Sequence, residues 1–517
     1  MAYDILDEPF IETVLGQQPR LVTLPGLFAA WGSGGHDLVL DGMRPHQRPA
    51  MHMFLCQTAA AAAQRADSAD LTVGAEEWHQ RLLAIAPSSA WHLVGDRDED
   101  AAFLQPPVTK EIAADFKSAS SPDDLTVLVL AKNHIMKQSR MGQAEPWAWI
   151  CALVELQTMS GYGGAKNYGV ARMNGGCGSR PLVAIYPDMR DGARWSRDVT
   201  VLLEQPDAIR NKVDGFAPRG QGIVATWTEP WDGAAQLQVS QLDPLCVEVC
   251  RRLRLRQKGG RLTAVVGNST DARIGGTDRM QGKLGDPWGP LDGNGEKLLT
   301  LAEDGWTTHK LRELIVPGAK CAFRISLLQQ PRASETGPLF FHAAVTVGGN
   351  GKTGGFHEVT VPIPGNKVFS IFGEPEGRDH IGRTATRMAE DGDNAGKALR
   401  AGVFRFCQGQ KPARDLKWDA REPSAWVSQV GPTLHGRVRA TFFEHLWKAD
   451  DANGDTSAWR EWLRTETVKI FDNAISAMPY RQECFFQAEA SARGMLMASL
   501  NRAFPMPHKP MIEEAAQ

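Results

Sequence analysis

A Gly-Lys-Thr triplet, Gly351–Thr353, lies in a glycine-rich stretch between two short apolar runs, and such a triplet ends the phosphate-binding loop of many nucleotide-binding proteins. That loop needs a glycine five positions before the triplet and a helix after it, whose amides hold the phosphates. Thr346 occupies the glycine position, and Phe356–Val361 alternates as a strand does before Pro362 and Pro364. The pattern excludes a phosphate-binding loop. It predicts a hairpin tip, which is either a surface turn or a tip that approaches another surface closely.

Few other residues have the types and spacing of a catalytic site. His36 and Asp37 form an isolated pair without a partner histidine, and His46 and His52, six positions apart, have no acidic neighbour at ligand spacing. The Gly-x-Ser-x-Gly and His-Glu-x-x-His motifs do not occur. We therefore expect a binding protein without catalytic residues, and no cofactor.

Two further patterns that suggest metal sites fail on spacing. Asp451, Asn453 and Asp455 resemble a calcium loop, but glycine stands at the fourth position instead of the sixth, which predicts an interhelical turn. Of eight cysteines only Cys246 and Cys250 lie close together, four residues apart. That spacing predicts one face of a helix and free buried thiols, not a zinc-binding pair.

The net charge of −3 does not indicate whether the protein binds a nucleic acid, but the distribution of charge along the chain is informative. Residues 251–283 contain nine basic and two acidic residues, and residues 131–180 contain six basic and two acidic residues. Basic stretches interleaved with glycine are typical of a nucleic-acid footprint, and equally of a solvated charged surface.

The chain of 517 residues has 42% hydrophobic content, enough for a large core and several domains. It contains no run of about 18 apolar residues that could span a bilayer. Its first residues are acidic where a secretory signal would be basic and then apolar. We therefore expect a cytoplasmic protein without a membrane partner.

The elements change character near residue 375. Before it, short apolar runs separated by glycine and proline predict a mixed α/β domain, residues 1–375, with a buried helix near Pro49–Ala66. After it, residues 376–517 show long helical periodicity. The predicted helices lie near Thr384–Cys407, His435–Ala449, Ser457–Met478 and Gln482–Ala503. Their short connections predict a C-terminal four-helix bundle, and the whole chain an α+β fold.

The most unusual stretch of the first domain is Gly161–Gly178, with seven glycines in eighteen residues. Lys166, Asn167 and Arg172 are interspersed among them, and this composition suits backbone contact with a ligand. The preceding residues, ALVELQTMS, predict a helix, whereas a dinucleotide-binding turn would follow a strand.

In order along the chain, these features resemble the CasA family, the large subunit of the type I-E CRISPR surveillance complex, Cascade. The resemblance rests on the opening YDILDEPFIETVLGQQPRLVTLPGLFAA, on AFLQPP at residues 102–107, on the GYGG loop, on the glycine hairpin and on the helical bundle. The opening LDEPFI and the glycine loop are its more specific parts.

The resemblance implies a function. Members of this family recognise the protospacer-adjacent motif in double-stranded DNA, help to open the duplex and recruit a helicase-nuclease, while a guide CRISPR RNA reads the target by base pairing. The implied partners are the other Cascade subunits, the guide RNA, the target DNA and the recruited helicase-nuclease.

The resemblance also implies contact residues. The loop that reads the minor groove falls on Gly161–Gly169, the guide-contacting loop on Ala131–Pro146, and the wedge that enters the duplex on Gly348–Gly355. A groove-entering cation falls on either Arg279 or Lys283. The implied nucleic-acid contacts are Lys132, Asn133, His134, Lys137, Arg140, Gly161, Gly163, Gly164, Lys166, Asn167, Arg279, Lys283, Gly349, Asn350, Gly351, Lys352 and Thr353.

The chain departs from the family pattern at two points. The hairpin tip lacks the family's wedge glutamine and has Asn350, Lys352 and Thr353 instead, which leaves the preferred motif open. The cysteine-pair motif of some members is also missing, so we expect no zinc.

Other interpretations remain at this stage. In the bundle, arginines either guide a DNA strand or form ordinary surface; they are Arg437, Arg439, Arg460 and Arg464. For the whole protein, the alternatives are a metal-dependent phosphohydrolase or nuclease that uses His36 and Asp37, and a nonspecific nucleic-acid-binding protein.

Overall fold

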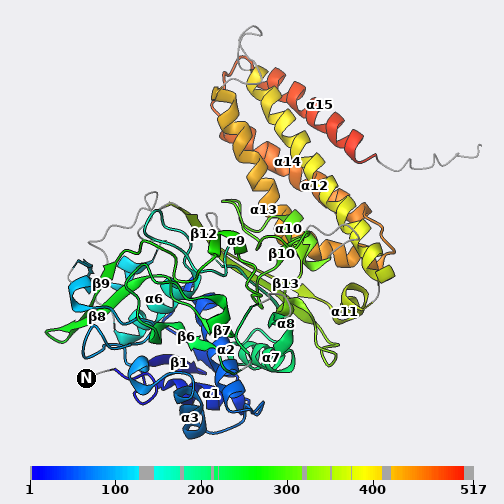
Figure 1. The fold of residues 1–517 in the computed structure, drawn as a ribbon. Helices are drawn as coiled ribbons and strands as arrows, with labels where there is room; N and C mark the ends of the chain where they lie inside the picture. The colour runs from blue at the N-terminus through cyan, green and yellow to red at the C-terminus, as the bar shows by residue number, and fades with distance from the viewer. Residues whose placement is uncertain are drawn as a thin grey trace, which may run out of the picture. The chain divides into compact units, whose positions relative to one another are not determined.

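The computed structural model describes residues 3–113, 115–126, 145–174, 180–210, 215–218, 220–316, 323–349, 352–373, 375–409 and 421–505. The chain forms two compact units. The first comprises Met1–Trp306 with Ala322–Gly365, and the second comprises Thr307–Cys321 with Asn366–Gln517. Figure 1 shows the elements of both units.

The first unit mixes helices and strands. Its helices are α1 (Leu24–Gly32), α2 (Gln47–Arg65), α3 (Ala75–Leu83), α4 (Lys110–Ala113), α6 (Pro146–Met159), α7 (Asp191–Glu204), α8 (Pro206–Arg210) and α9 (Thr277–Met280). Its strands are β1 (Ile11–Leu15), β2 (Gln18–Val22), β3 (Leu38–Leu40), β4 (Lys117–Ala119), β5 (Leu182–Tyr186), β6 (Ile223–Ala225), β7 (Leu242–Val247), β8 (Arg252–Lys258), β9 (Arg261–Gly267), β10 (Leu291–Asp292), β11 (Phe323–Arg324), β12 (Leu339–Gly349) and β13 (Lys352–Ile363).

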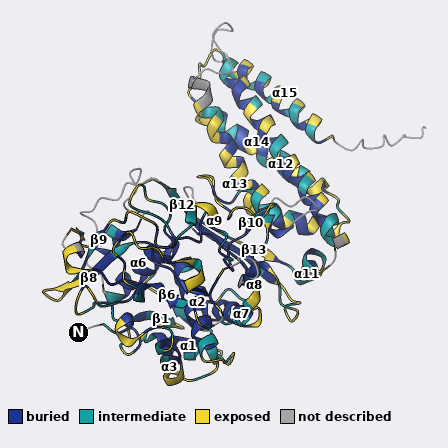
Figure 2. Cartoon of the chain, in the orientation of Figure 1, coloured by how far each residue is buried: buried dark blue, intermediate teal, exposed yellow. Residues whose placement is uncertain are grey.

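Helix α2 is buried along most of its length (Figure 2). Its alanine run, Ala59–Ala63, is at most 2% exposed. Alanine is the strongest helix former, and its small side chain lets α6, α7 and β7 pack closely against α2. The helix predicted near Pro49–Ala66 is therefore confirmed.

The sheets of the first unit are small and mostly antiparallel. Strands β2, β1 and β3 form one, and β4, β9 and β8 form another. The long hairpin β12–β13 joins β5 in a third, but β5 pairs only with Phe340–Ala344 of β12. The outer part of the hairpin is therefore a two-stranded ribbon.

The second unit is helical. It contains α10 (Thr308–Ile315), α11 (Gly365–Phe372), α12 (Pro375–Gly409), α13 (Arg421–Asp451), α14 (Ser457–Ala477) and α15 (Phe485–Ala503). Helix α12 packs against α13, α14 and α15 (Figure 1). Gly402 of α12 makes close packing possible, because a Cβ there would lie 3.1 Å from the Cβ of Leu496 on α15. The α+β fold with a C-terminal helical bundle is thus confirmed.

Residues 452–456, between α13 and α14, form the turn that the sequence predicted in place of a calcium loop. Asn453 and Gly454 have positive φ angles of 54° and 83°. The Asp455 carboxylate accepts hydrogen bonds from the backbone amide and the hydroxyl of Ser457. The aspartate therefore fixes the start of α14.

The helix predicted for Cys246 and Cys250 is wrong. Cys246 lies in β7 and Cys250 lies in the loop after it, although both are buried free thiols as expected. Strand β7 pairs in parallel with β6 and all its residues are buried, so it lacks the alternation that marks a strand. Pro244 within this run disfavours a helix and was the available signal.

Candidate nucleic-acid interface

The predicted glycine loop is an ordered loop that follows the end of α6. Its base is closed by the amide of Val170, which donates to the Ser160 carbonyl at 3.3 Å. Gly169 lies directly against the start of the loop, where an added Cβ would come within 2.9 Å of the Gly161 carbonyl carbon. A side chain at position 169 would therefore force the base of the loop open.

The tip of the loop is a tight turn. The amide of Gly163 donates to Asn167 O at 2.8 Å, and the amide of Asn167 donates to Gly164 O at 3.0 Å. Gly164 and Lys166 have positive φ angles of 116° and 70°. Gly163, Ala165 and Lys166 are exposed, so the turn presents its backbone to solvent.

Many carbonyl groups of the loop accept hydrogen bonds from within the chain, whereas amide groups at the tip stay unbonded among the residues that the structure describes. Its bonded carbonyls belong to Gly161, Gly164, Lys166, Asn167 and Tyr168. Within the described residues, the amides of Ala165 and Lys166 have no hydrogen-bond partner, and the Lys166 ammonium forms no ion pair. The tip therefore offers hydrogen-bond donors and one positive charge, which suits a ligand rich in acceptors.

The segment after β9 lies beside this loop. The amide of Ser269 donates to Lys166 O at 3.1 Å, and the Tyr168 hydroxyl donates to Thr270 O at 2.9 Å. Tyr162 and Tyr168 also contact each other, with ring centroids 6.1 Å apart. The structure thus brings the glycine loop together with the segment that leads to Arg279 and Lys283.

The structure distinguishes the two candidate cations. Lys283 forms an ion pair with Glu296, with Nζ 2.9 Å from Oε2. Arg279 lies exposed on the short helix α9 and forms no ion pair within the described residues. Arg279 is therefore the more available of the two for a phosphate or base-edge contact.

Most basic side chains of the stretch 251–283 are engaged in contacts within the chain. Arg251, Arg252, Arg254 and Arg273 donate to backbone carbonyls, Arg256 pairs with Asp98, and Lys283 pairs with Glu296. Burial lowers the pKa of Arg254 and of Arg273 to about 10. These arginines hold loops in place, a role that a count of charges in the sequence does not reveal.

The predicted wedge is the outer end of the β12–β13 hairpin. Gly349 pairs with Lys352, whose side chain is exposed, and the Thr353 hydroxyl donates to Val347 O at 3.0 Å beside a bulge at Val347/Gly348. Trp306 braces the ribbon through a 3.1 Å hydrogen bond from its indole N–H to His357 O. The hairpin prediction is confirmed; its proposed contact with DNA stays a prediction.

Several predicted contact residues lie outside the described residues. They are Lys132, Asn133, His134, Lys137 and Arg140 of the expected guide-contacting loop, and Asn350 and Gly351 of the hairpin tip.

The bundle arginines connect helices. Arg460 pairs with Asp391 of α12 at 2.8 Å, and Arg464 donates to the Asn501 side chain of α15 at 2.6 Å. Arg437 lies 3.7 Å from Glu466, and Arg439 is exposed. At least Arg460 and Arg464 therefore have a packing role within the bundle.

The residues of the alternative enzyme hypothesis do not form a metal site. Asp37 is exposed and its carboxylate pairs with Arg190 at 2.6 Å, at the edge of an open groove. An adjacent guanidinium occupies the lone pairs that a metal ion would need. Within the described residues, no metal-ligand cluster includes His36 or Asp37.

One group of possible metal ligands, His52, Cys56 and Asp198, is completely buried. The Asp198 carboxylate accepts hydrogen bonds from His52 at 2.8 Å, Tyr186 at 3.0 Å, Trp288 at 3.0 Å and Arg197 at 3.2 Å. Burial would raise the pKa of Asp198, but the bonds from His52 and the charge of Arg197 bring it below its ordinary value. With four donors on one carboxylate, the group fits a polar core better than a metal site.

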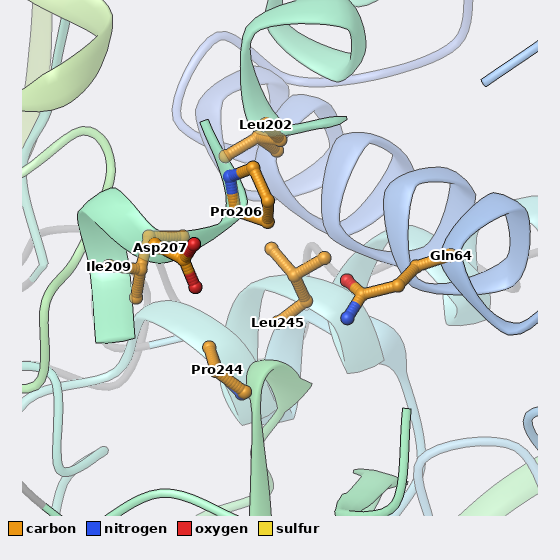
Figure 3. Close-up of a pocket in the computed structure, with 7 residues that line it drawn as sticks. All are labelled: Gln64, Leu202, Pro206, Asp207, Ile209, Pro244 and Leu245. Carbon is orange, nitrogen blue, oxygen red and sulfur yellow. The ribbon is translucent and has the colours of Figure 1, made fainter. Parts of the chain in front are cut away.

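The pocket in Figure 3 lies between α2, α8 and β7 of the first unit, and it is lined mostly by apolar side chains. Leu202, Leu245 and Ile209 are among them, with Gln64 and Asp207 as polar members. Its interior has room for little more than a water molecule. It therefore does not fit a small-molecule ligand.

Within the described residues, no helix is long and apolar enough to cross a membrane. Comparison of the sequence with known families and with curated proteins gives no match.

Comparison with solved structures finds CRISPR-associated Cse1 proteins that match over nearly the whole chain. Cse1 from Acidimicrobium ferrooxidans matches with a TM-score of 0.62 at 13% identity, over 97% of this chain and 98% of its own. Cse1 from Thermobifida fusca matches with a TM-score of 0.63 at 13% identity, over 97% and 98%. CasA (Cse1) from Thermus thermophilus gives 0.60 at 13% identity, over 97% and 100%.

The chain therefore has the fold of CasA, also called Cse1. This fold is the one that the resemblance in sequence features led us to expect, and it includes both compact units.

Proposed function

We propose that this chain is the large subunit of an RNA-guided CRISPR surveillance complex, in which it recognises the protospacer-adjacent motif in double-stranded DNA without catalysing a reaction. Its partners are then the other Cascade subunits, the guide CRISPR RNA, the target DNA and a recruited helicase-nuclease. The fold it shares with Cse1 proteins supports this assignment.

The observation that carries the proposal is the donor-rich tip of the glycine loop. The minor-groove edges of adenine and thymine offer only acceptors, and the groove is about 6 Å wide. Ala165 and Lys166 present free amides on a turn with little side-chain bulk, next to exposed Gly163. Such a turn can approach base edges that larger side chains could not reach.

The β12–β13 hairpin supports duplex opening in the same proposal. It is a stiff two-stranded ribbon with Lys352 beside its tip, and it projects beyond the strand that it pairs with. Inserting a side chain between two base pairs costs a few kcal/mol, because the bases must unstack. A paired ribbon can hold the inserted side chain in place better than a flexible loop can.

The test reconstitutes the chain with the partner subunits and a guide RNA, and compares its affinity for matched duplexes that differ only in the base pairs flanking the target. We expect affinity to depend on the flank, and this dependence to fall at least tenfold in Gly163→Val. In the folded chain a side chain at position 163 would crowd the Asn167 Cβ, 3.3 Å away, and fill the approach to the turn.

Gly494→Ala is the matched control, because nothing lies within 4 Å of a Cβ at that position on α15. Binding by the unmodified chain that ignores the flanking base pairs and needs no partner would overturn the proposal. Metal-dependent hydrolysis of DNA by the purified chain, lost in His36→Ala, would replace it with the enzyme hypothesis.

A further inference from the structure

The Arg251 side chain joins the two ends of the glycine loop. Its guanidinium donates to Gly161 O at 3.2 Å, at the start of the loop, and to Tyr168 O near its end. It also donates to Cys250 O at 3.0 Å. One planar group thus bridges carbonyls that are seven residues apart in the chain.

Arg251 is itself held by a buried side chain. The Gln157 carbonyl oxygen accepts from the Arg251 amide at 2.8 Å, and the Gln157 amide group donates to Arg251 O at 2.9 Å. Gln157 is completely buried in α6, the helix from whose end the glycine loop emerges. The Arg251 backbone, from which the guanidinium extends, is therefore fixed relative to that helix.

The surroundings of Arg251 favour a role inside the loop over direct contact with a ligand. Within the described residues Arg251 forms no ion pair, and its guanidinium donates to three backbone carbonyls. An added Cβ at Gly163 would lie 3.4 Å from its Nη2 atom, so the guanidinium also supports the turn from beneath. The planar guanidinium bonds the two ends through two separate nitrogens, whereas a lysine ammonium carries its three donors on one nitrogen and does not reproduce that geometry.

We infer that Arg251 is a positioning residue: it fixes the backbone of Gly161–Gly169 so that the tip amides point outward in the unbound protein. The recognition part of this inference rests on the proposed function. The structural part does not, since all of these bonds lie within the chain itself.

The first measurement uses the isolated full chain. Amide hydrogen exchange at Gly163, Asn167 and Val170, whose amides are bonded within the loop, is compared between the natural chain, Arg251→Lys and Arg251→Gln. We expect exchange at least tenfold faster in both variants, with unchanged exchange in the β12–β13 hairpin as an internal reference. Unchanged exchange in the loop would overturn the inference whatever the protein's function.

The second measurement uses the reconstituted complex. A phosphate contact would be largely restored by lysine and would contribute about 0.9 to the slope of log K against log salt. Positioning predicts that Arg251→Lys does not restore flank discrimination and leaves the salt slope unchanged. Lys166→Gln, which removes an exposed charge from the tip, is the contrasting variant and should flatten the slope.

The outcomes separate the two proposals. Faster loop exchange together with at least tenfold weaker flank discrimination supports the inference. Faster exchange with full discrimination overturns it, because an ordered loop would then not be needed for recognition. A natural chain that does not discriminate flanks overturns the proposed function, and the exchange result alone then decides whether Arg251 holds the loop.

Discussion

Replacing Glu155 by glutamine should change how the protein's stability depends on pH. Glu155 lies on α6, is 2% exposed, and one of its carboxylate oxygens has no hydrogen-bond partner. Burial raises its pKa to about 7, although a hydrogen bond from Thr126 and the charge of Arg251 oppose the rise. The folded protein therefore holds a proton on Glu155 that the unfolded chain has already lost near neutral pH.

The raised pKa of Glu155 sets the direction in which stability changes with pH. Stability from the protonated carboxyl is fully present below pH 4.5, the ordinary value, and is lost as pH rises through about 7. The difference between the two pKa values corresponds to roughly 3 kcal/mol, at 1.36 kcal/mol per tenfold change. Glu155→Gln cannot ionise, so its stability relative to the natural chain should rise by about that amount from pH 5 to pH 8.

The assay is urea unfolding followed by tryptophan fluorescence at pH 5, 6, 7 and 8. Glu461→Gln, on the exposed face of α14, is the control and should differ from the natural chain by the same amount at every pH. If the difference between the natural chain and Glu155→Gln is also constant across this range, the carboxyl is not buried and protonated as described, and the argument fails.

Three further predictions concern stability. Gly169→Ala would place a Cβ against backbone atoms at the base of the glycine loop, and urea unfolding should show a loss of about 1–3 kcal/mol, whereas Gly494→Ala should add about 0.5–1 kcal/mol; similar effects from both would contradict the close approach. Asp198→Asn removes the charge that four donors share, and should lower the free energy of unfolding by about 3–5 kcal/mol; a loss below about 1 kcal/mol would contradict the network. Burial lowers the pKa of His342 to about 3, so its stability contribution is present above pH 6.5 and lost on acidification; His342→Gln should flatten the loss between pH 6.5 and pH 4, and equal slopes would contradict this.

Helical periodicity predicted the bundle well because each helix buries one face. The helix predicted for Ser457–Met478 matches α14, Ser457–Ala477, almost residue for residue. Helix α13 is much longer than its prediction and contains Pro432 in its interior. Packing against neighbouring helices overrides the local cost of the proline, which sequence reasoning takes as a boundary.

The amino-acid composition was enough to locate the candidate site in the sequence. The roles of its residues became visible only from the contacts in the structure. Seven glycines between residues 161 and 178 indicated backbone contact with a ligand, and this contact stays a prediction. Within the chain, Gly169 approaches the start of its own loop closely. The sequence analysis counted Arg251 only as one of the basic residues of the stretch 251–283. Nothing in the neighbouring sequence indicates that its guanidinium donates to a carbonyl ninety residues away. A hydrogen bond between residues far apart in the chain produces no periodic pattern in the sequence, so a single sequence does not reveal it.

The β12–β13 hairpin, to which Trp306 is hydrogen-bonded, is connected to the helical unit in two ways. The chain passes between the two compact units three times. One crossing directly follows Trp306, which is hydrogen-bonded to His357 of β13, and another comes two residues after β13 ends. A displacement of the helical unit would therefore pull on β13 along the chain that follows it, and on His357 through the hydrogen bond from Trp306. The hairpin is thus linked to the helical unit at two points, one through the chain and one through a hydrogen bond.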